Sequence, residues 1–118
     1  MLPPGAAKKV TIYVNEDTRS HIEPLWSKLL NFLRQKHIAG ATLLRANAGF
    51  GSHESMHLAF SEYAGEHRPV RIEFIESPDK VAELLPSLCE LVTDGLVTVQ
   101  DITVVKCASR DTGRKQPR

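Results

Sequence analysis

Residues 40–57, GATLLRANAGFGSHESMH, are the stretch from which the organisation of the chain can be worked out. Gly40 is followed by an aliphatic and β-branched run that ends with Arg45. Gly49, Gly51 and a polar segment with two histidines come next. Glycine tolerates positive φ and lets a ligand approach the backbone, so this pair can either turn the chain or present bare amide N–H groups to an anion. The stretch therefore predicts a strand that ends in a functional loop.

Further strands are predicted where apolar and polar residues alternate, which is the period of a strand with one face on a core. This alternation marks residues 10–14, VTIYV, and residues 69–75, PVRIEFI, and a last strand is predicted over residues 96–106. The strand of the opening stretch is predicted over residues 42–48. The connection that follows it, residues 49–68, is of a length that in a compact domain is usually either functional or mobile.

Two helices are predicted where apolar residues are spaced three and four apart and so share one helical face. The first runs over about residues 24–37, with Gly40 as its stop. The second begins after Ser77, a residue type that caps helix N-termini, and ends at Gly95.

Two local irregularities are expected inside these elements. Pro86 lies within the second helix, where a missing hydrogen bond and steric crowding predict a kink. In the last strand, the apolar phase shifts by one residue across Gln100 and Asp101, which predicts a β-bulge.

The predicted order, βαββαβ, is that of an α+β ferredoxin-like fold, a four-stranded antiparallel sheet with two helices on one face. The other face of the sheet would be too apolar for a wholly wet surface and too polar for the core of a monomer. A homo-oligomer that covers this face and leaves polar clefts between subunits is the expected resolution. The residues expected on this face are Tyr13, Leu44 and Ile75, beside Thr11, Arg71, Glu73 and Thr98.

Length and composition indicate one soluble globular domain, because 118 residues with 42% apolar and 25% charged side chains suffice for a single core. Residues 110–118 hold four of the fifteen basic side chains and one of the fourteen acidic ones, so the rest of the chain is mildly acidic and no nucleic-acid partner is expected. We expect a flexible N-terminus over residues 1–8, one domain over 9–107 and a disordered basic tail over 108–118.

The N-terminus lacks the apolar region of a signal peptide and no run reaches membrane-spanning length, which favours a cytoplasmic protein that is not itself in the membrane. Cys89 and Cys107 have neither metal-type nor redox-type spacing, so reduced structural thiols are expected.

With these elements placed, the chain resembles the bacterial and archaeal family called domain of unknown function 190, which is similar to the PII nitrogen-regulatory signalling proteins. The resemblance covers about residues 9–106. It is carried by VTIYVNED at 10–17, PL at 24–25, HIAGATLLR at 37–45, AGFG at 48–51 with His57 downstream, IE at 72–73 with LLP at 84–86, and GL at 95–96 with Asp101.

The resemblance implies a ferredoxin-like homotrimer with ligand clefts between subunits and a loop after the second strand that reports ligand status to another protein. Because the family is associated with ion-transport proteins, a membrane transport protein is the implied partner.

The first functional hypothesis is a small anionic effector, such as an adenine nucleotide, bound between subunits. The backbone amides of Gly49, Phe50, Gly51 and Ser52 and the guanidinium of Arg45 would meet its phosphate. Taken without the resemblance, the two glycines are also compatible with a simple turn. PII proteins use further basic residues from other loops, and the candidates here are Arg68, Arg71 and Lys106.

The second hypothesis comes from His53, Glu54 and His57, which match the H-E-x-x-H pattern of zinc proteases. The pattern follows two glycines in a loop and lacks the long helix that those enzymes need, and no nucleophile stands beside an assignable base, so an enzyme is not expected. A non-catalytic metal site formed by His53 and His57, with His67, is the alternative to the anion site, and solvated loop histidines are the simplest reading.

Overall fold

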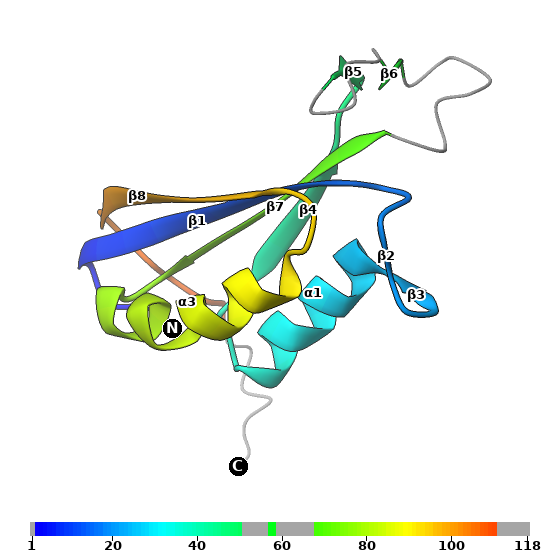
Figure 1. Cartoon of the computed structure of the whole chain (residues 1–118). Coiled ribbons are helices and arrows are strands. Elements are labelled where there is room, and N and C mark those ends of the chain that lie inside the picture. The colour runs from blue at the N-terminus through cyan, green and yellow to red at the C-terminus, as the bar shows by residue number, and fades with distance from the viewer. Residues whose placement is uncertain (1, 51–56, 59–67, 111–118) are drawn as a thin grey trace.

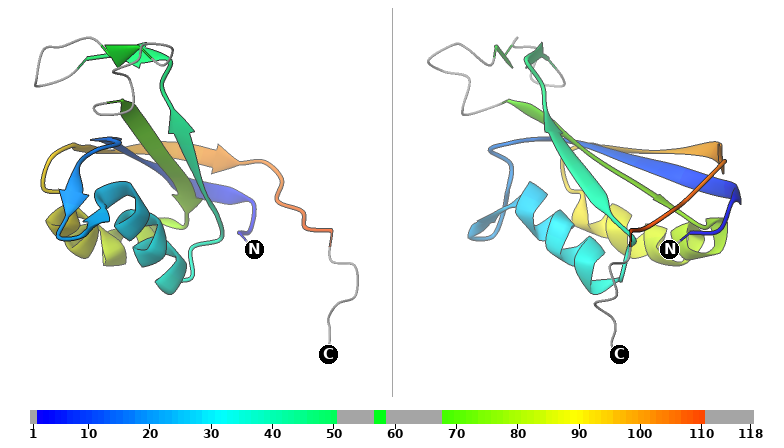
Figure 2. Two further views of the ribbon diagram at one scale, coloured as in Figure 1. Left: turned by 90° about the vertical axis from the view of Figure 1, so that its right-hand side faces the viewer. Right: turned by 180° about the vertical axis from the view of Figure 1, so that it is seen from behind.

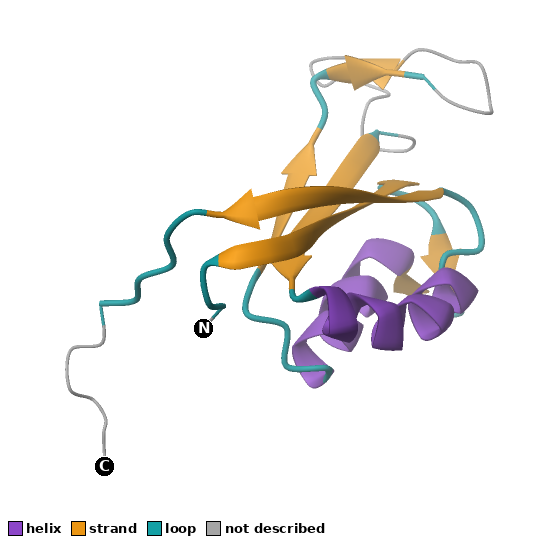
Figure 3. Cartoon of the chain, turned by 90° about the vertical axis from the view of Figure 1, so that its left-hand side faces the viewer, coloured by secondary structure: helices purple, strands orange, loops and turns teal. Residues whose placement is uncertain are grey.

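The computed structural model describes residues 2–50, 57–58 and 68–110, and the structural statements below concern these residues. A single four-stranded antiparallel sheet has the strand order β4-β7-β1-β8, and two helices lie on one of its faces (Figures 1 and 3). The elements in chain order are β1 (Gly5–Asn15), β2 (Arg19–Ser20), β3 (Glu23–Pro24), α1 (Leu25–Gln35), β4 (Ala41–Arg45), β5 (Ala48–Gly49), β6 (His57–Leu58), β7 (Pro69–Glu76), α3 (Pro78–Leu91) and β8 (Leu96–Val104). The ferredoxin-like prediction is confirmed.

The core lies between the helices and the facing side of the sheet. Alternate residues of β1 and β7 point to this side, because successive side chains of a strand point to opposite faces. They meet the helix residues that recur every three or four positions. Trp26 packs against the rim of the buried cluster. The cluster comprises Val10, Ile12, Val14, Val70, Ile72 and Phe74 from the sheet and Leu25, Leu29, Leu33, Val81, Leu84 and Leu88 from the helices.

Strand β1 begins at Gly5, earlier than residue 10, where alternation predicted it. Gly5 pairs with Val104 and Lys8 with Asp101, and the Lys8 ammonium lies 2.7 Å from the Asp101 carboxylate. Residues 5–8 therefore belong to the sheet, which corrects the expectation of a flexible N-terminus up to residue 8. The segment Gly5-Ala6-Ala7 has little intrinsic strand preference, and its pairing with β8 determines its conformation.

The β-bulge predicted in β8 is wrong, because the pairing of β1 with β8 runs without interruption from Gly5–Val104 to Tyr13–Leu96. Val97 lies opposite the buried Ile12 on the helix side, whereas Ile102 lies opposite Ala7 on the other side. The shift in apolar phase therefore marks a change of the face that carries apolar residues. The strand also ends at Val104 and does not reach Lys106.

Helix α1 is shorter than predicted and ends differently. Pro24 precedes the helix as its N-cap and pairs with Arg19 in the β2–β3 hairpin. At the other end, His37 adopts a left-handed φ of 61°, its N–H donates to the carbonyl of Arg34, and the N–H of Ile38 donates to the carbonyl of Leu33. This is a Schellman motif, so the stop is at His37 and not at Gly40.

Helix α3 begins as predicted, because the backbone N–H of Lys80 donates to the Ser77 hydroxyl over 3.3 Å and Pro78 takes the first helical position. Pro86 lies inside the helix. The kink expected there stays a prediction.

The buried carboxylate of Glu76 connects the end of β7, through a hydrogen bond, to the segment between α1 and β4. It is only 6% exposed and accepts hydrogen bonds from the N–H of Ala39, at 3.1 Å, and of Ser77, at 3.4 Å. Backbone donors of two separate connections are thus satisfied by one side chain.

Candidate functional site

The sheet face opposite the helices carries large apolar side chains, and no helix in the described part of the chain covers it (Figure 3). Pairing places Leu44, Arg71, Tyr13 and Leu96 in one row across the four strands. The apolar members of this row, together with Ile75 on the same face, are between 37% and 56% exposed. We call this surface, defined by Tyr13, Leu44, Ile75 and Leu96, the open face.

Strand β4 stops at Arg45, three residues before the predicted end. Ala48–Gly49 instead forms the separate strand β5, which pairs with β6, so that Ala48 lies opposite Leu58 and Gly49 opposite His57. This short pair lies beyond the end of the main sheet and away from the helices (Figures 1 and 2). The predicted single connection over residues 49–68 therefore contains a strand at its start, whereas residues 51–56 and 59–67 lie outside the described residues.

Backbone hydrogen bonds join the strand ends from which the 49–68 connection departs and to which it returns. The N–H of Ala46 donates to the carbonyl of Pro69 over 3.0 Å, and the N–H of Glu16 donates to the carbonyl of Arg68 over 2.7 Å. The ends of β1 and β4 and the start of β7 are thus held together at one end of the sheet.

A pocket of about 280 Å³ lies at this end of the sheet. It brings together four of the six predicted effector-binding residues, namely Arg45, Gly49, Phe50 and Arg71, whereas Gly51 and Ser52 lie outside the described residues. The remaining lining residues are Tyr13, Leu44, Ala46, Ala48, Pro69 and Val70. We call this cavity the loop-root pocket.

The two arginines reach the loop-root pocket from opposite faces of the sheet. Arg45 is the pairing partner of Val70, which is buried on the helix side, whereas Arg71 pairs with Leu44 and Tyr13 on the open face. Adjacent residues of a strand point to opposite sides, so the side chains of Arg45 and Arg71 leave opposite faces of the sheet, and both residues line the pocket at its end.

Each arginine has a carboxylate partner. The Nε of Arg45 lies 3.1 Å from the Oε2 of Glu16, and its guanidinium carbon lies 5.8 Å from the centre of the Trp26 ring, within cation–π range. The Nε of Arg71 lies 2.8 Å from the Oε2 of Glu73. No local signal in the sequence pairs Glu16 with an arginine 29 positions away.

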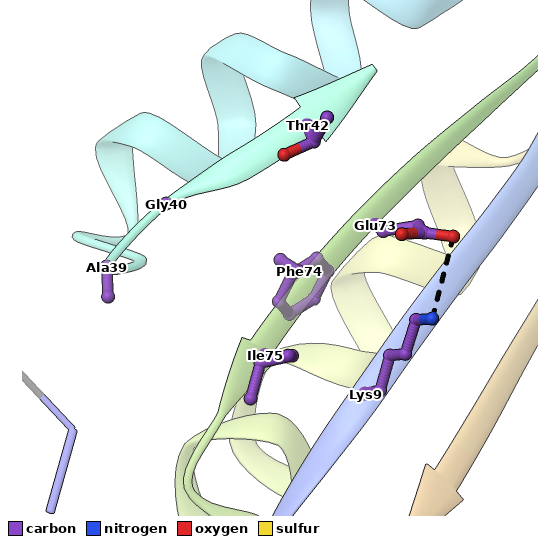
Figure 4. A pocket seen from close by; sticks show the side chains of 7 residues that line it. All are labelled: Lys9, Ala39, Gly40, Thr42, Glu73, Phe74 and Ile75. Carbon is purple, nitrogen blue, oxygen red and sulfur yellow. Dashed lines mark ion pairs between the residues drawn. The ribbon is translucent and has the colours of Figure 1, made fainter. Parts of the chain in front are cut away.

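A second pocket of about 360 Å³ is lined by residues of β1, β4, β7 and the segment that leads into β4 (Figure 4). Glu73 lines it and also contacts the Nζ of Lys9, at 3.6 Å, so this carboxylate connects the two pockets. Lys9 lines this pocket too, and the other lining residues are Ala39, Gly40, Thr42, Phe74 and Ile75.

The two other basic candidates have different positions. Arg68 adjoins the loop-root pocket, and its Nε lies 3.7 Å from the Oε1 of Glu16. Lys106 follows Val104, which pairs with Gly5 at the opposite end of the sheet from Arg71. Within one copy of the chain, Lys106 is therefore not brought to the pocket.

The metal hypothesis gains no support from the described residues. His53 and His67 lie outside them, and His57 is placed only as part of the backbone of β6. Among the described residues, no group of three or more histidine, cysteine, aspartate or glutamate side chains could hold a metal ion. The histidine site stays a prediction. Cys89 and Cys107 form no disulfide within the described residues, and their role as reduced structural thiols stays a prediction.

The helices that the structure describes are too short or too polar to cross a bilayer.

Comparison with known proteins gives fold neighbours that are PII-like. The structure of CPII, a nitrogen regulatory PII-like protein from Thiomonas intermedia K12 bound to ADP, AMP and bicarbonate, matches with a TM-score of 0.66 and 19% identity, over 90% of this chain and 94% of that one. A putative PII-like signalling protein from Thermus thermophilus matches with a TM-score of 0.65 and 20% identity, over 88% of this chain and 94% of that one.

Sequence comparison gives the family. A UPF0166 protein of Aquifex aeolicus is 26% identical over 98 residues, which is 83% of this chain and 92% of that protein. The model of the DUF190 family, described as an uncharacterized ACR, matches residues 7–104, which span β1 to β8. The chain therefore belongs to the DUF190 family, as its motifs predicted.

Proposed function

We propose that this chain is a PII-like regulatory protein whose loop-root pocket binds a small phosphate-bearing effector, an adenine nucleotide, and passes its occupancy to another protein. The observation that carries the proposal is the meeting of Arg45, Arg71 and the backbone of Gly49 in one cavity at the base of the 49–68 connection.

The lining of the pocket suits a nucleotide chemically. Guanidinium groups bind phosphate oxygens through paired, charge-assisted hydrogen bonds, and the side chains of Arg45 and Arg71 supply two such groups. Tyr13, Leu44 and the exposed ring of Phe50 add an apolar and aromatic wall on which a base could stack. The ADP and AMP in the CPII structure, a fold neighbour, are consistent with this ligand class.

We propose further that three copies assemble through the open face. Its apolar side chains are exposed in one row across the sheet, and β4 and β8 leave both edges of the sheet unpaired within the described chain. Tyr13 and Leu44 belong to both the open face and the loop-root pocket, so a neighbouring subunit on this face would form part of the pocket's wall. This matches the homotrimer that the sequence resemblance implies.

Regulation then requires only that the effector prefers one arrangement of the residues at the loop root, because ligand binding shifts the population toward the arrangement it favours. A partner protein that contacts the 49–68 connection would then bind more strongly or more weakly, depending on whether the effector is bound. As the resemblance implies, we propose a membrane transport protein as the partner. We also propose, on the sequence features given above, a cytoplasmic location and no catalytic role for the chain.

Calorimetric titration with AMP, ADP and ATP, together with native mass spectrometry, tests the proposal. We expect binding of at least one nucleotide to a trimer, and about a tenfold to hundredfold loss of affinity in Arg71→Gln and in Arg45→Gln. Lys36→Gln removes an exposed positive charge that does not line the pocket and serves as the control. Absence of binding for all three nucleotides would refute the nucleotide proposal, and an unchanged affinity in both arginine variants would refute the site.

A further inference from the structure

Both arginines of the loop-root pocket are held by carboxylates that are themselves shared with a second cation. Glu16 contacts Arg45 at 3.1 Å and Arg68 at 3.7 Å, and Glu73 contacts Arg71 at 2.8 Å and Lys9 at 3.6 Å. In each group the arginine lines the pocket, whereas the second cation does not. The same three-charge arrangement thus occurs twice, once on each side of the sheet.

Exposure differs systematically within these groups. The side chains of Arg45 and Arg71 are 42% and 45% exposed, whereas those of Glu16 and Glu73 are 23% and 22% exposed. The arginines are therefore accessible to a ligand, and the carboxylates behind them are half-buried. A half-buried carboxylate that lost its only partner would carry an unpaired charge at a substantial cost.

Arg68 and Lys9 avoid the cost of an unpaired carboxylate at Glu16 and Glu73. When Arg45 turns from Glu16 to a ligand, Arg68 remains beside the carboxylate, and Lys9 remains beside Glu73 when Arg71 turns. The Oε1 of Glu16 and the Nε of Arg68 are buried and have no hydrogen-bond partner, although they lie 3.7 Å apart. A small shift of these two groups toward each other would satisfy both of them once Arg45 has left.

We propose that Glu16 and Glu73 are the residues that set the anion affinity of the pocket, by competing with the ligand for Arg45 and Arg71. Phosphate binding exchanges each arginine from its carboxylate to the ligand, while Arg68 and Lys9 retain the carboxylates. The inference rests on the proposed function, because it assumes a phosphate-bearing ligand in the loop-root pocket. It adds that the ligand-free pocket is held by its own acids and that its affinity is lower than two free arginines would give.

The exchange at Arg45 has an optical signature. Trp26 is the only tryptophan of the chain, and its ring carries the Arg45 guanidinium at 5.8 Å. Departure of a cation from the ring face changes the electrostatic environment of the indole. Trp26 fluorescence should therefore change when a nucleotide binds, and it should change in the same direction without nucleotide when Glu16 is neutralised.

The test is a double-mutant cycle with ADP as the probe. In Glu16→Gln and Glu73→Gln we expect ADP to bind about twofold to fivefold more tightly than in the unaltered protein, the range that a partly exposed ion pair supplies. In Arg68→Gln we expect weaker binding by a similar factor, because Glu16 then depends on Arg45 alone. In the double variant Glu16→Gln/Arg68→Gln, the effect of Arg68→Gln should vanish, because it acts through Glu16.

The matched control is the ion pair of Lys8 with Asp101, which lies at the other end of β1 and does not line the pocket. Asp101→Asn and Lys8→Gln change the net charge by the same amounts as the test variants. They report how much of any effect comes from net charge alone, and we expect them to leave ADP affinity unchanged.

The outcomes separate this inference from the proposed function. If the unaltered protein binds ADP but Glu16→Gln and Glu73→Gln bind it no more tightly, or if Arg68→Gln weakens binding equally with and without Glu16, the exchange is wrong and the nucleotide site stands. If ADP binds to Glu16→Gln and Glu73→Gln but not to the unaltered protein, and the unaltered protein still binds AMP or ATP, the exchange is supported in its strongest form. If no variant binds ADP, both proposals fall.

Discussion

The carbonyl oxygen of Tyr13 lies so close to Gly95 that a β-carbon at position 95 would be 2.3 Å from it. The same β-carbon would be 2.9 Å from a methyl group of Val14. Gly95 follows α3 and leads directly into β8, so it lets this turn pass against the end of the central strand β1. Sequence reasoning gave this glycine a role only as a helix stop.

Gly95→Ala should therefore destabilise the protein by about 3 kcal/mol, because a backbone oxygen cannot move aside as the end of a flexible side chain could. Gly40→Ala is the matched control, since a β-carbon at position 40 would meet nothing within 4 Å. Thermal or urea unfolding of both variants at one fixed protein concentration measures the difference. Equal stability of the two variants would contradict the close contact.

His37→Gly should stabilise the protein by about 1 kcal/mol, because His37 adopts a left-handed φ of 61° that costs an L-residue more than it costs glycine. The side chain of His37 is exposed, so little packing is lost. The hydrogen bond from the Lys80 ammonium ends on the backbone carbonyl of His37 and is retained. Urea unfolding checks the change, and a loss of stability would mean that the imidazole contributes more than the backbone strain.

Glu76→Ala should destabilise the protein by about 2 kcal/mol, since the backbone N–H groups of Ala39 and Ser77 would lose a charged acceptor. Glu83→Ala, at an exposed position of α3, serves as the control and should change the free energy of unfolding little. Amide hydrogen exchange adds a local measurement. We expect faster exchange at Ala39 in the Glu76 variant, and unchanged exchange there would refute the role of the carboxylate.

Leu44→Glu and Leu96→Glu should each dissociate the proposed trimer, because a buried interface cannot accept an unpaired carboxylate without a large desolvation cost. Ile22→Glu is the control, as Ile22 is 90% exposed but lies in the turn between β2 and β3, away from the open face. Native mass spectrometry at micromolar concentration reports the subunit number. A monomer before any substitution, or a trimer in both open-face variants, would remove the open face as the interface.

The fold could be predicted because the core-forming segments show the two-residue period of strands or the three-to-four-residue period of helices without interruption. Residues 10–14 and 69–75 alternate, the helices repeat every three or four positions, and these are the residues that the structure buries. The prediction failed where one strand changes its apolar face. Val97 and Ile102 lie on opposite sides of β8, and only the pairing with β1 distinguishes this from a bulge.

The candidate site was predictable in part, for a different reason. Arg45, Gly49 and Phe50 belong to one continuous motif, and the structure brings Arg71 to the same pocket from a neighbouring strand. The carboxylates behind the arginines were not predictable. Glu16 and Arg45 are 29 positions apart, and they come into contact because β1 and β4 end at the same end of the sheet.

Strand β1 is formed first along the chain, yet its two neighbours in the sheet, β7 and β8, are the last two strands. During synthesis, β1 therefore has no neighbouring strand to pair with until most of the second half of the polypeptide has left the ribosome. Sheets that depend on such distant segments fold slowly and expose an unpaired strand in the meantime. A truncated translation product that stops before residue 69 would have no main sheet at all, and chaperones or proteases would meet it as an unfolded chain.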